Sequence, residues 1–205
     1  MNKNNLIFDI DYTLIKTIQV KENEINNNYF IKLNNFFGNV FLRPHLEKFF
    51  NFCYLNFNVG FWTAGSSMYC KEILKLILTE NQFNKTIMIL ARDNNDYIDL
   101  KTNKFYKNII SDKIVKPLDI VWNDKFLGKI LNPRNTLLID DNADILNMNK
   151  DNYLLVSEFK GIVDEDNFLC YLINLLDEVK NYDDVRKISE IKNITFNCNK
   201  MNNYL

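Results

Sequence analysis

The sequence contains little glycine, proline and histidine. Its 205 residues include five glycines, three prolines and one histidine, whereas an average soluble protein of this length has roughly two to three times as many glycines and prolines. The chain therefore offers no glycine-rich loop of the kind that binds nucleotide phosphates. The histidine, His45, directly follows Arg43-Pro44. We interpret it as structural and do not expect histidine to act as the general acid or base.

Cysteines and long apolar runs are also scarce. The four cysteines form no C-x-x-C pair and lie far apart, which is inconsistent with a zinc site or a disulfide framework and favours a reducing compartment. The N-terminus lacks the apolar region of a signal peptide, and no run reaches the roughly 18 apolar residues of a membrane span. We therefore expect an intracellular protein, cytoplasmic or nuclear, with no membrane partner.

The charges of the chain nearly cancel. Its 25 Lys and Arg residues against 26 Asp and Glu residues give a net charge of −1, so overall electrostatic attraction to nucleic acid is not expected. Asparagine is abundant, which indicates an AT-rich genome because its codons are AT-rich, and says little about function. Hydrophobic residues make up 47% of the chain, enough for the core of one α/β domain.

Apolar segments of strand length alternate with segments of helix length. This alternation predicts an α/β fold, a Rossmann-like and mostly parallel sheet with helices on both faces. Residues 18–42 contain two β-rich runs around Asn34-Asn35, which predict a small β-hairpin insertion. Pro44 is expected to open a helix, and Ser66 or Ser67 to cap the next one. The predicted strands are residues 5–10, 58–63, 86–91, 136–140 and 152–156, and the later helical segments are 68–78, 118–131, 166–180 and 183–192; the rest of 93–135 is expected to be irregular.

Two acidic pairs follow apolar strands of this prediction. Asp9 and Asp11 lie two positions apart in LIFDIDYTLIK, and Asp140 and Asp141 end TLLIDD. Residues i and i+2 of a strand point to the same face, and ligands of open α/β sheets bind beyond the carboxyl ends of the strands. One such pair alone would be more typical of loop-capping aspartates. Two pairs together favour a Mg²⁺ site, because Mg²⁺ prefers oxygen ligands.

Phosphate-binding groups are also available at a strand end. Thr63 ends a predicted strand, and its hydroxyl together with the amides of Ala64 and Gly65 could donate to phosphate oxygens. A threonine alone at this position is also typical of a helix cap. A cation is expected to offset the acids and the phosphate, and Lys116 in IVKPLD is the candidate, with Lys113 as the alternative.

These residues, in this order, resemble the four motifs of the haloacid dehalogenase (HAD) superfamily. The closer resemblance is to the phosphatases of the RNA polymerase II C-terminal domain (CTD), including the small, NLI-interacting factor-like branch. It extends over about residues 5–188 and is carried by Asp9-x-Asp11-x-Thr13, RPHLEKFF, FWTAGSS, ILARD, VKPLD, Asp140-Asp141 and DDVR. Gly65 departs from the serine usual in that family, and Asp141 from the asparagine frequent in the small branch.

The resemblance implies a HAD-like domain over residues 1–188 without a large cap, a tail over 189–205, and Mg²⁺-dependent phosphatase activity. Asp9 would be the nucleophile that forms an aspartyl-phosphate, and Asp11 the general acid and base. Thr63 and Lys116 would hold the phosphoryl oxygens. The resemblance further implies substrate-binding roles for Thr13, Ala64, Gly65 and Arg92, and a metal site made by Asp9, the carbonyl of Asp11, Asp140, which would also orient Lys116, and Asp141.

The implied substrate is phosphoserine or phosphothreonine in a polypeptide. Residues 17–42 are too few for a large helical lid, and an open cleft suits a protein or peptide partner such as the C-terminal repeats of RNA polymerase II. Two alternatives remain at this point: a phosphatase acting on nucleotides or nucleic-acid ends, and a non-catalytic binding module. A lysine-rich segment is either a solvated surface or a contact for an acidic peptide; it contains Lys101, Lys104, Lys107, Lys113 and Lys116.

Overall fold

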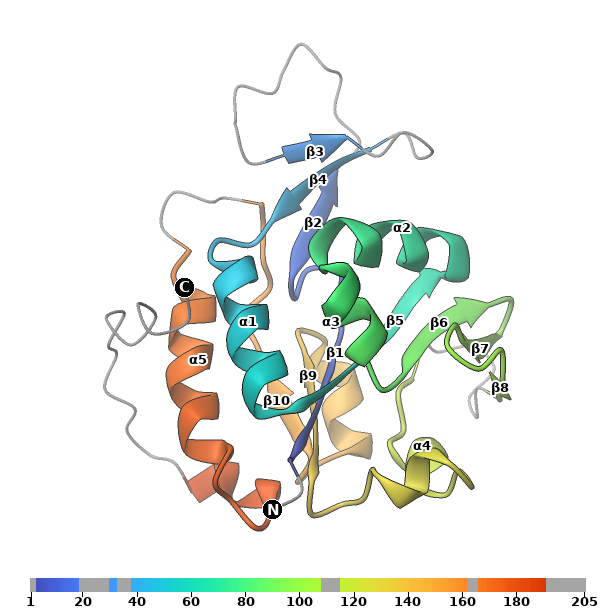
Figure 1. Ribbon diagram of the computed structural model, residues 1–205, viewed down its shortest axis with the longest axis vertical. Coiled ribbons are helices and arrows are strands. Elements are labelled where there is room, and N and C mark those ends of the chain that lie inside the picture. The colour runs from blue at the N-terminus through green and yellow to red at the C-terminus, as the bar shows by residue number, and fades with distance from the viewer. Residues whose placement is uncertain (1–2, 19–29, 33–37, 108–114, 162–165, 191–205) are drawn as a thin grey trace.

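The computed structural model describes residues 3–18, 30–32, 38–107, 115–161 and 166–190 (Figure 1). Its centre is a seven-stranded sheet in which the first five strands are parallel and the last two are antiparallel additions. The prediction of a mostly parallel α/β sheet is therefore confirmed. In spatial order the strands are β10 (Tyr153–Leu155), β9 (Thr136–Asp140), β1 (Asn5–Phe8), β5 (Asn58–Ser66), β6 (Ile89–Asp93), β7 (Asp96–Asp99) and β8 (Phe105–Tyr106).

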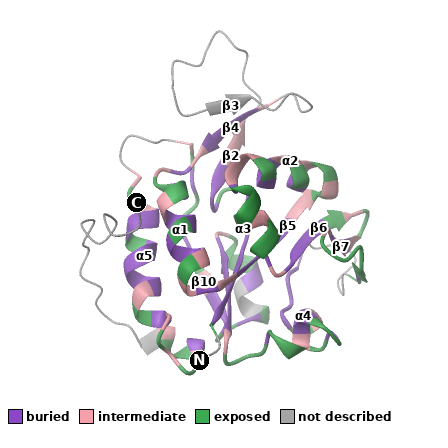
Figure 2. Cartoon of the chain, in the orientation of Figure 1, coloured by how far each residue is buried: buried purple, intermediate pink, exposed green. Residues whose placement is uncertain are grey.

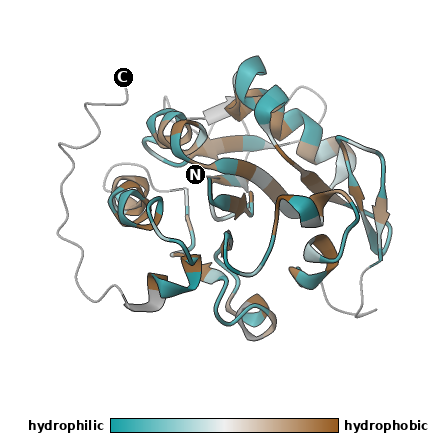
Figure 3. Ribbon diagram, turned by 60° about the horizontal axis from the view of Figure 1, so that its bottom comes forward, coloured by the Kyte–Doolittle hydropathy of each residue, from teal (hydrophilic) through white to brown (hydrophobic). Residues whose placement is uncertain are grey.

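The central strand β1 is buried on both sides, and its alternating side chains contribute to two separate cores. Leu6 and Phe8 pack in the larger core, where the ring centroids of Phe8 and Phe49 lie 5.4 Å apart in an edge-on arrangement. Ile7 faces the other way and packs with Trp62. Buried residues accordingly concentrate on the central strands, and hydrophilic residues on the outward sides of the helices (Figures 2 and 3).

Helices cover both faces of the sheet, as predicted, but the two faces are covered unequally. Three long helices, α1 (Leu46–Asn56), α2 (Ser67–Ile77) and α5 (Phe168–Val179), enclose the larger core. Among the described residues, the second face carries only short helical elements, namely α4 (Asp119–Trp122) and the 3₁₀ helices η2 (Leu127–Lys129) and η3 (Ala143–Met148). The remaining helices are α3 (Glu80–Lys85) and the 3₁₀ helix η4 (Val185–Glu190), where a longer α-helix was predicted. In the described residues no helix has both the length and the apolar character that a membrane crossing requires.

Several predicted element boundaries need correction. Strand β5 continues past Thr63 to Ser66, and β6 covers Ile89–Asp93 rather than 86–91. Helix α1 begins at Leu46 rather than at Pro44, because His45 adopts a left-handed conformation with φ of 69° and serves as the N-cap. Strand β1 ends at Phe8 rather than Ile10, because the chain turns after Asp9, and Tyr12 has a positive φ of 62°. The predicted serine cap is confirmed at Ser66, whose side chain accepts a hydrogen bond from the Tyr69 amide at 3.3 Å.

A small antiparallel sheet lies beyond the carboxyl end of β1 (Figure 1). Its strands are β2 (Ile15–Ile18), β4 (Asn39–Leu42) and β3 (Phe30–Lys32), in that order. The pairing of β3 with β4 confirms the predicted hairpin insertion, although its Asn34-Asn35 turn lies outside the described residues. The third strand, β2, was not predicted. This small sheet is the insertion that follows β1, and no large cap is seen in the part of the chain that is described.

Strands β7 and β8 were missed because β7 has an aspartate at each end and β8 is only two residues long, so neither gave an apolar run of strand length. Asp93 pairs with Asp96 across a tight turn in which Asn94 has a positive φ of 54°. Asp99 is buried, and its carboxylate accepts hydrogen bonds from the Ile89 amide at 3.1 Å and from Thr102 at 2.7 Å. An acid that satisfies backbone donors in this way can occupy a buried sheet position.

Candidate active site

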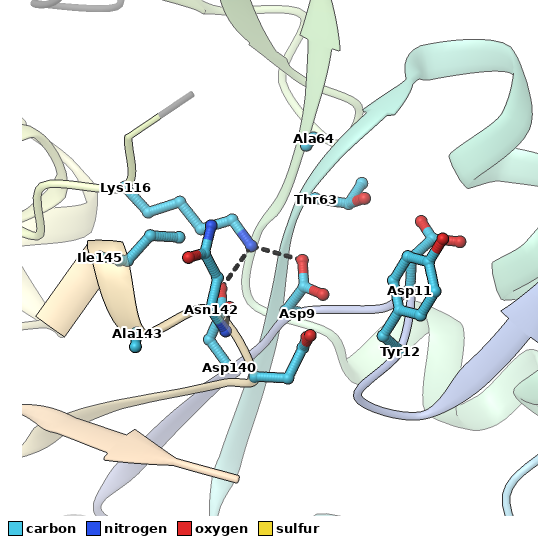
Figure 4. A pocket seen from close by; sticks show the side chains of 11 residues that line it. Asp9, Asp11, Tyr12, Thr63, Ala64, Lys116, Asp140, Asn142, Ala143 and Ile145 are labelled. Carbon is cyan, nitrogen blue, oxygen red and sulfur yellow. Dashed lines mark hydrogen bonds and ion pairs between the residues drawn. The ribbon is translucent and has the colours of Figure 1, made fainter. Parts of the chain in front are cut away.

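A cleft of about 420 Å³ lies at the carboxyl ends of β1, β5 and β9 (Figure 4). Parallel strands bring these ends to one edge of the sheet, which is where α/β folds bind ligands. Seven of the predicted site residues line the cleft: Asp9, Asp11, Thr63, Ala64, Lys116, Asp140 and Asp141. Four lining residues were not predicted: Tyr12, Asn142, Ala143 and Ile145.

Lys116 is the buried cation of the cleft. Its side chain is 2% exposed, and Nζ forms ion pairs with Asp9 Oδ1 and, at 2.7 Å, with Asp140 Oδ2. Asn149 fixes the backbone on both sides of Pro117, because its amide donates to the Lys116 carbonyl at 2.9 Å and its oxygen accepts from the Leu118 amide at 3.0 Å. The alternative lysine, Lys113, lies outside the described residues.

Burial and charge act in opposite directions on this ion pair. Burial raises the pKa of Asp9 to about 7, an effect that the Lys116 ammonium opposes. Burial would lower the pKa of Lys116, but the two carboxylates outweigh it and raise that pKa above its ordinary value. The proton shared by the pair therefore belongs to Lys116. A further cation near Asp9 would favour its ionised form still more.

Three carboxylates of the cleft lie close enough to share one metal ion. Asp9, Asp140 and Asp141 each offer an oxygen, and these atoms lie within 4.8 Å of one another. When ionised, these three carboxylates exceed the single Lys116 ammonium by two negative charges, which a divalent cation bound to them would balance. The all-oxygen donor set suits a hard cation such as Mg²⁺.

The strand-end acids are oriented by short local contacts. Thr13 donates to Asp141 Oδ1 at 2.9 Å, and the Asn142 amide donates to Asp140 Oδ1 at 2.8 Å. Tyr153 donates to the Asn142 carbonyl at 2.6 Å and to the Asp140 carbonyl at 3.2 Å. The loop after β9 is thus held by β10 and by the turn after β1.

Asp11 occupies a turn rather than the strand. It forms an isolated bridge with Ile15, and its side chain lies outside the cluster of three carboxylates. Burial raises its pKa, and a hydrogen bond from the Tyr69 hydroxyl opposes that rise. The same hydroxyl lies 2.7 Å from Thr17 Oγ1. Asp9 and Asp11 both face the cleft, as predicted, but across a turn and not as neighbours on one strand.

Three residues assigned to substrate binding do not line the cleft. Thr13 is buried against Asp141. The Gly65 amide donates to Thr63 Oγ1 at 2.9 Å. Arg92 is exposed at the end of β6, where Nε donates to the Asn94 carbonyl at 2.8 Å. Of this group only Ala64 borders the cleft.

Arg43 holds the turn that carries Asp11, a role that sequence reasoning missed. It is 2% exposed, and Nη1 donates to the carbonyls of Thr13 at 2.9 Å and Ser157 at 3.0 Å. Nε forms an ion pair with Asp166 at 3.1 Å. The Arg-Pro pair was part of the resemblance, but only the fold shows which backbone segments the guanidinium connects.

The comparisons with known proteins agree with this geometry. A family model described as NLI interacting factor-like phosphatase matches residues 4–186. The chain belongs to this family. The predicted resemblance to CTD phosphatases is thereby confirmed for nearly the whole length of the described chain.

Several relatives in this family carry CTD phosphatase names. Two putative CTD phosphatase-like proteins 355R, from Invertebrate iridescent virus 6 and Invertebrate iridescent virus 3, are 24% and 27% identical; the matches cover 68% and 77% of this chain and 73% and 86% of theirs. The Drosophila melanogaster ubiquitin-like domain-containing CTD phosphatase 1 is 25% identical, over 77% of this chain and 42% of its own.

Solved structures show the same fold. A fission yeast RNA polymerase II CTD phosphatase Fcp1 variant bound to beryllium fluoride has a TM-score of 0.52 at 16% identity, over 79% of this chain and 44% of its own. A second Fcp1 structure has a TM-score of 0.52 at 15% identity, over 86% of this chain and 47% of its own. This chain thus spans less than half the length of those Fcp1 chains.

Proposed function

We propose that this protein is a Mg²⁺-dependent phosphatase that hydrolyses phosphoserine and phosphothreonine in polypeptides through an aspartyl-phosphate. The observation that carries the proposal is the ion pair of buried Lys116 with Asp9, which is one of three carboxylates whose oxygens lie within 4.8 Å of one another. Lys116, together with a divalent cation on the carboxylates, would supply positive charge where a phosphoryl group is transferred, which is the main requirement of this reaction.

In the first step, an oxygen of Asp9 attacks phosphorus and the bond from phosphorus to the serine oxygen breaks. Asp11 gives its proton to that departing oxygen. In the second step, Asp11 removes a proton from water, whose oxygen attacks phosphorus and breaks the bond to Asp9. Inorganic phosphate leaves, and both aspartates return to their starting protonation states.

Asp9 and Asp141 would hold the Mg²⁺ ion together with the Asp11 carbonyl, and Asp140 would complete the acidic cluster while orienting Lys116. The bound ion would supply charge that stabilises the transferring phosphoryl oxygens and keeps Asp9 ionised. Lys116, the Thr63 hydroxyl and the Ala64 amide would bind those oxygens from the protein side, since all three residues line the cleft.

The proposed substrate is a protein or peptide for two reasons. The curated relatives are named as CTD phosphatases, and the described residues include no large cap that would close the cleft. The C-terminal repeats of RNA polymerase II are the proposed partner, within an intracellular compartment. Arg92 is exposed on β6, where it pairs with Ser66 of β5, and it would contact the polypeptide that flanks the phosphate. Residues 1–188 would form the catalytic domain.

The first test is hydrolysis of 4-nitrophenyl phosphate with Mg²⁺, with EDTA, and by Asp9→Asn. We expect activity only in the wild type with Mg²⁺. Activity that persists in EDTA and in Asp9→Asn would exclude the proposed chemistry, and a complete lack of activity would favour a binding module. A second test compares phosphoserine heptad peptides with 3′- and 5′-phosphorylated oligonucleotides, and a tenfold preference for oligonucleotides would overturn the polypeptide substrate.

A further inference from the structure

Tyr69 connects the carboxylate of Asp11 to the small sheet. It lies in the first turn of α2, where its amide donates to the cap residue Ser66 at 3.3 Å. From there its hydroxyl reaches Asp11 Oδ1 on one side and Thr17 Oγ1, at 2.7 Å, on the other. The three groups come from the turn after β1, from α2 and from β2, so they meet only in the folded chain.

The direction of these two hydrogen bonds follows from the chemistry of the groups. Once Asp11 has given up its proton, its ionised carboxylate only accepts hydrogen bonds, and a tyrosine hydroxyl has one hydrogen to give. Tyr69 therefore donates to Asp11 Oδ1, and Thr17 donates to Tyr69. With Oδ1 occupied as an acceptor, the working proton of Asp11 is directed to its other oxygen, Oδ2.

Gly65 leaves the space that the Tyr69 ring occupies. A Cβ atom at position 65 would lie 2.7 Å from Tyr69 Cδ1 and 3.2 Å from Thr63 Oγ1. The first distance is far below a van der Waals contact, so any larger residue at this position would force the ring to move. Related CTD phosphatases usually have serine here, as noted above. In this protein the side chain of a serine would collide with the Tyr69 ring, and glycine avoids the collision.

We propose that Tyr69 is a positioning residue for Asp11 and that Gly65 makes room for it, an inference that rests on the proposed phosphatase function. Tyr69 does not touch the reacting atoms. Its hydroxyl holds the carboxylate of Asp11 in the orientation that delivers a proton to the departing oxygen, and Thr17 holds the tyrosine. Loss of the hydroxyl should therefore affect proton transfer selectively.

The test compares two substrates whose leaving groups differ in their need for a proton. A serine alkoxide is strongly basic and requires protonation as it leaves, whereas 4-nitrophenolate leaves without it. Because kcat/KM reports the steps up to transfer onto Asp9, Tyr69→Phe should lower kcat/KM roughly tenfold for a phosphoserine peptide and less than about twofold for 4-nitrophenyl phosphate.

The matched control is Tyr54→Phe, which removes another tyrosine hydroxyl with a short contact, 2.6 Å to Thr86 Oγ1, away from the cleft-lining residues. This variant should have the wild-type kcat/KM for both substrates. Gly65→Ala should reproduce the selective loss, and adding it to Tyr69→Phe should produce no further selective loss. Thr17→Val should give the same pattern more weakly, and it provides a second variant that keeps the ring in place.

The outcomes separate this inference from the function on which it rests. A wild type inactive on both substrates would overturn the phosphatase proposal and the inference together. If the wild type is active and Tyr69→Phe lowers kcat/KM equally for both substrates, or for neither, the positioning role alone is overturned. A selective loss in Gly65→Ala that persists unchanged on top of Tyr69→Phe would overturn the role assigned to Gly65.

Discussion

Asp9 and Asp11 are two residues apart in the sequence, but they are held in different ways. Asp9 directly follows the central strand, and its amide still donates to the Ile139 carbonyl at 2.9 Å. Asp11 belongs to a turn, and its carboxylate is held by the Tyr69 hydroxyl of α2. The sheet itself therefore sets the position of Asp9, whereas the position of Asp11 depends on side chains from elements packed beyond the sheet.

The two acids also differ in the charge of their partners. Asp9 meets a buried ammonium, Lys116, and a charged partner favours one protonation state strongly. The partner of Asp11 is a neutral hydroxyl, that of Tyr69, and burial raises the pKa of the Asp11 carboxyl. A neutral partner imposes a weaker preference, which suits a group that must carry a proton in one step and lose it in the next. Substitutions at Asp9 and its partners are therefore expected to have different effects from substitutions at Asp11 and its partners.

The largest effect is expected from Asp9→Asn. It removes the nucleophile, so kcat should fall by roughly 10⁴-fold or more for every substrate. Asp11→Asn should instead preserve much of the first step with 4-nitrophenyl phosphate, because that leaving group needs no proton. Rapid-mixing measurements of 4-nitrophenolate release would show the difference as an initial burst in Asp11→Asn and none in Asp9→Asn. Equal losses in both variants would remove the distinction between the two acids.

The next effect concerns stability. Lys116→Met leaves Asp9 and Asp140 buried without their cation, and removing one partner of a buried ion pair costs about 3–5 kcal/mol in the free energy of unfolding. Lys75→Met is the control, since its ion pair with Glu72 is on the surface and 3.3 Å long, and such pairs contribute less than about 1 kcal/mol. Urea unfolding monitored by circular dichroism measures both. Similar losses for the two variants would contradict the buried charge balance of the cleft.

A smaller effect is expected from metal binding. Mg²⁺ at about 100 times its Kd should raise the free energy of unfolding by about 2.7 kcal/mol, measurable as a rise in melting temperature that EDTA reverses. Asp141→Asn should weaken this stabilisation, because Asp141 belongs to the cluster of three carboxylates. Asp11→Asn should retain it, since the Asp11 side chain lies outside that cluster. If Asp11→Asn alone lost the stabilisation by Mg²⁺, the metal would be bound by the Asp11 side chain and not by the cluster of three carboxylates.

The smallest effect is expected outside the cleft. Arg92 is exposed and does not line the cleft, so Arg92→Ala should leave kcat/KM for 4-nitrophenyl phosphate unchanged. For a phosphoserine peptide the KM should rise about threefold, which corresponds to roughly 0.7 kcal/mol. Steady-state kinetics on both substrates decide the matter, and a larger loss on the small substrate would place Arg92 on the phosphoryl group.

The Asp9 side of the site could be predicted from the sequence because its signals are local. An apolar run followed by an acid predicts a buried strand with a carboxylate at its end, and parallel pairing brings Asp9 and Asp140 to one edge. The sequence did not decide between Lys116 and Lys113, because both lie in a segment whose path the sequence does not define. Only the ion pairs of Lys116 fix its place in the cleft.

The Asp11 side could not be predicted in the same way. Tyr69 lies 58 residues from Asp11 and 52 from Thr17, and its pattern in the sequence is that of an ordinary residue in the first turn of a helix. Arg43 meets the Thr13 carbonyl across 30 residues and the Ser157 carbonyl across 114. Such contacts depend on how elements pack, and one chain considered alone carries no local sign of them.

The most direct test of the account is to locate the phosphate during turnover. Asp11→Asn is mixed with 4-nitrophenyl phosphate and Mg²⁺, quenched in acid, digested and analysed by mass spectrometry, with the Asp9→Asn, Asp11→Asn double variant as the control. Phosphate should appear on the peptide that contains Asp9 and be absent from the control, because transfer to Asp9 proceeds while its hydrolysis lacks a base. Phosphate on any other residue, or turnover by the wild type with no phosphate on Asp9 in Asp11→Asn, would contradict the account.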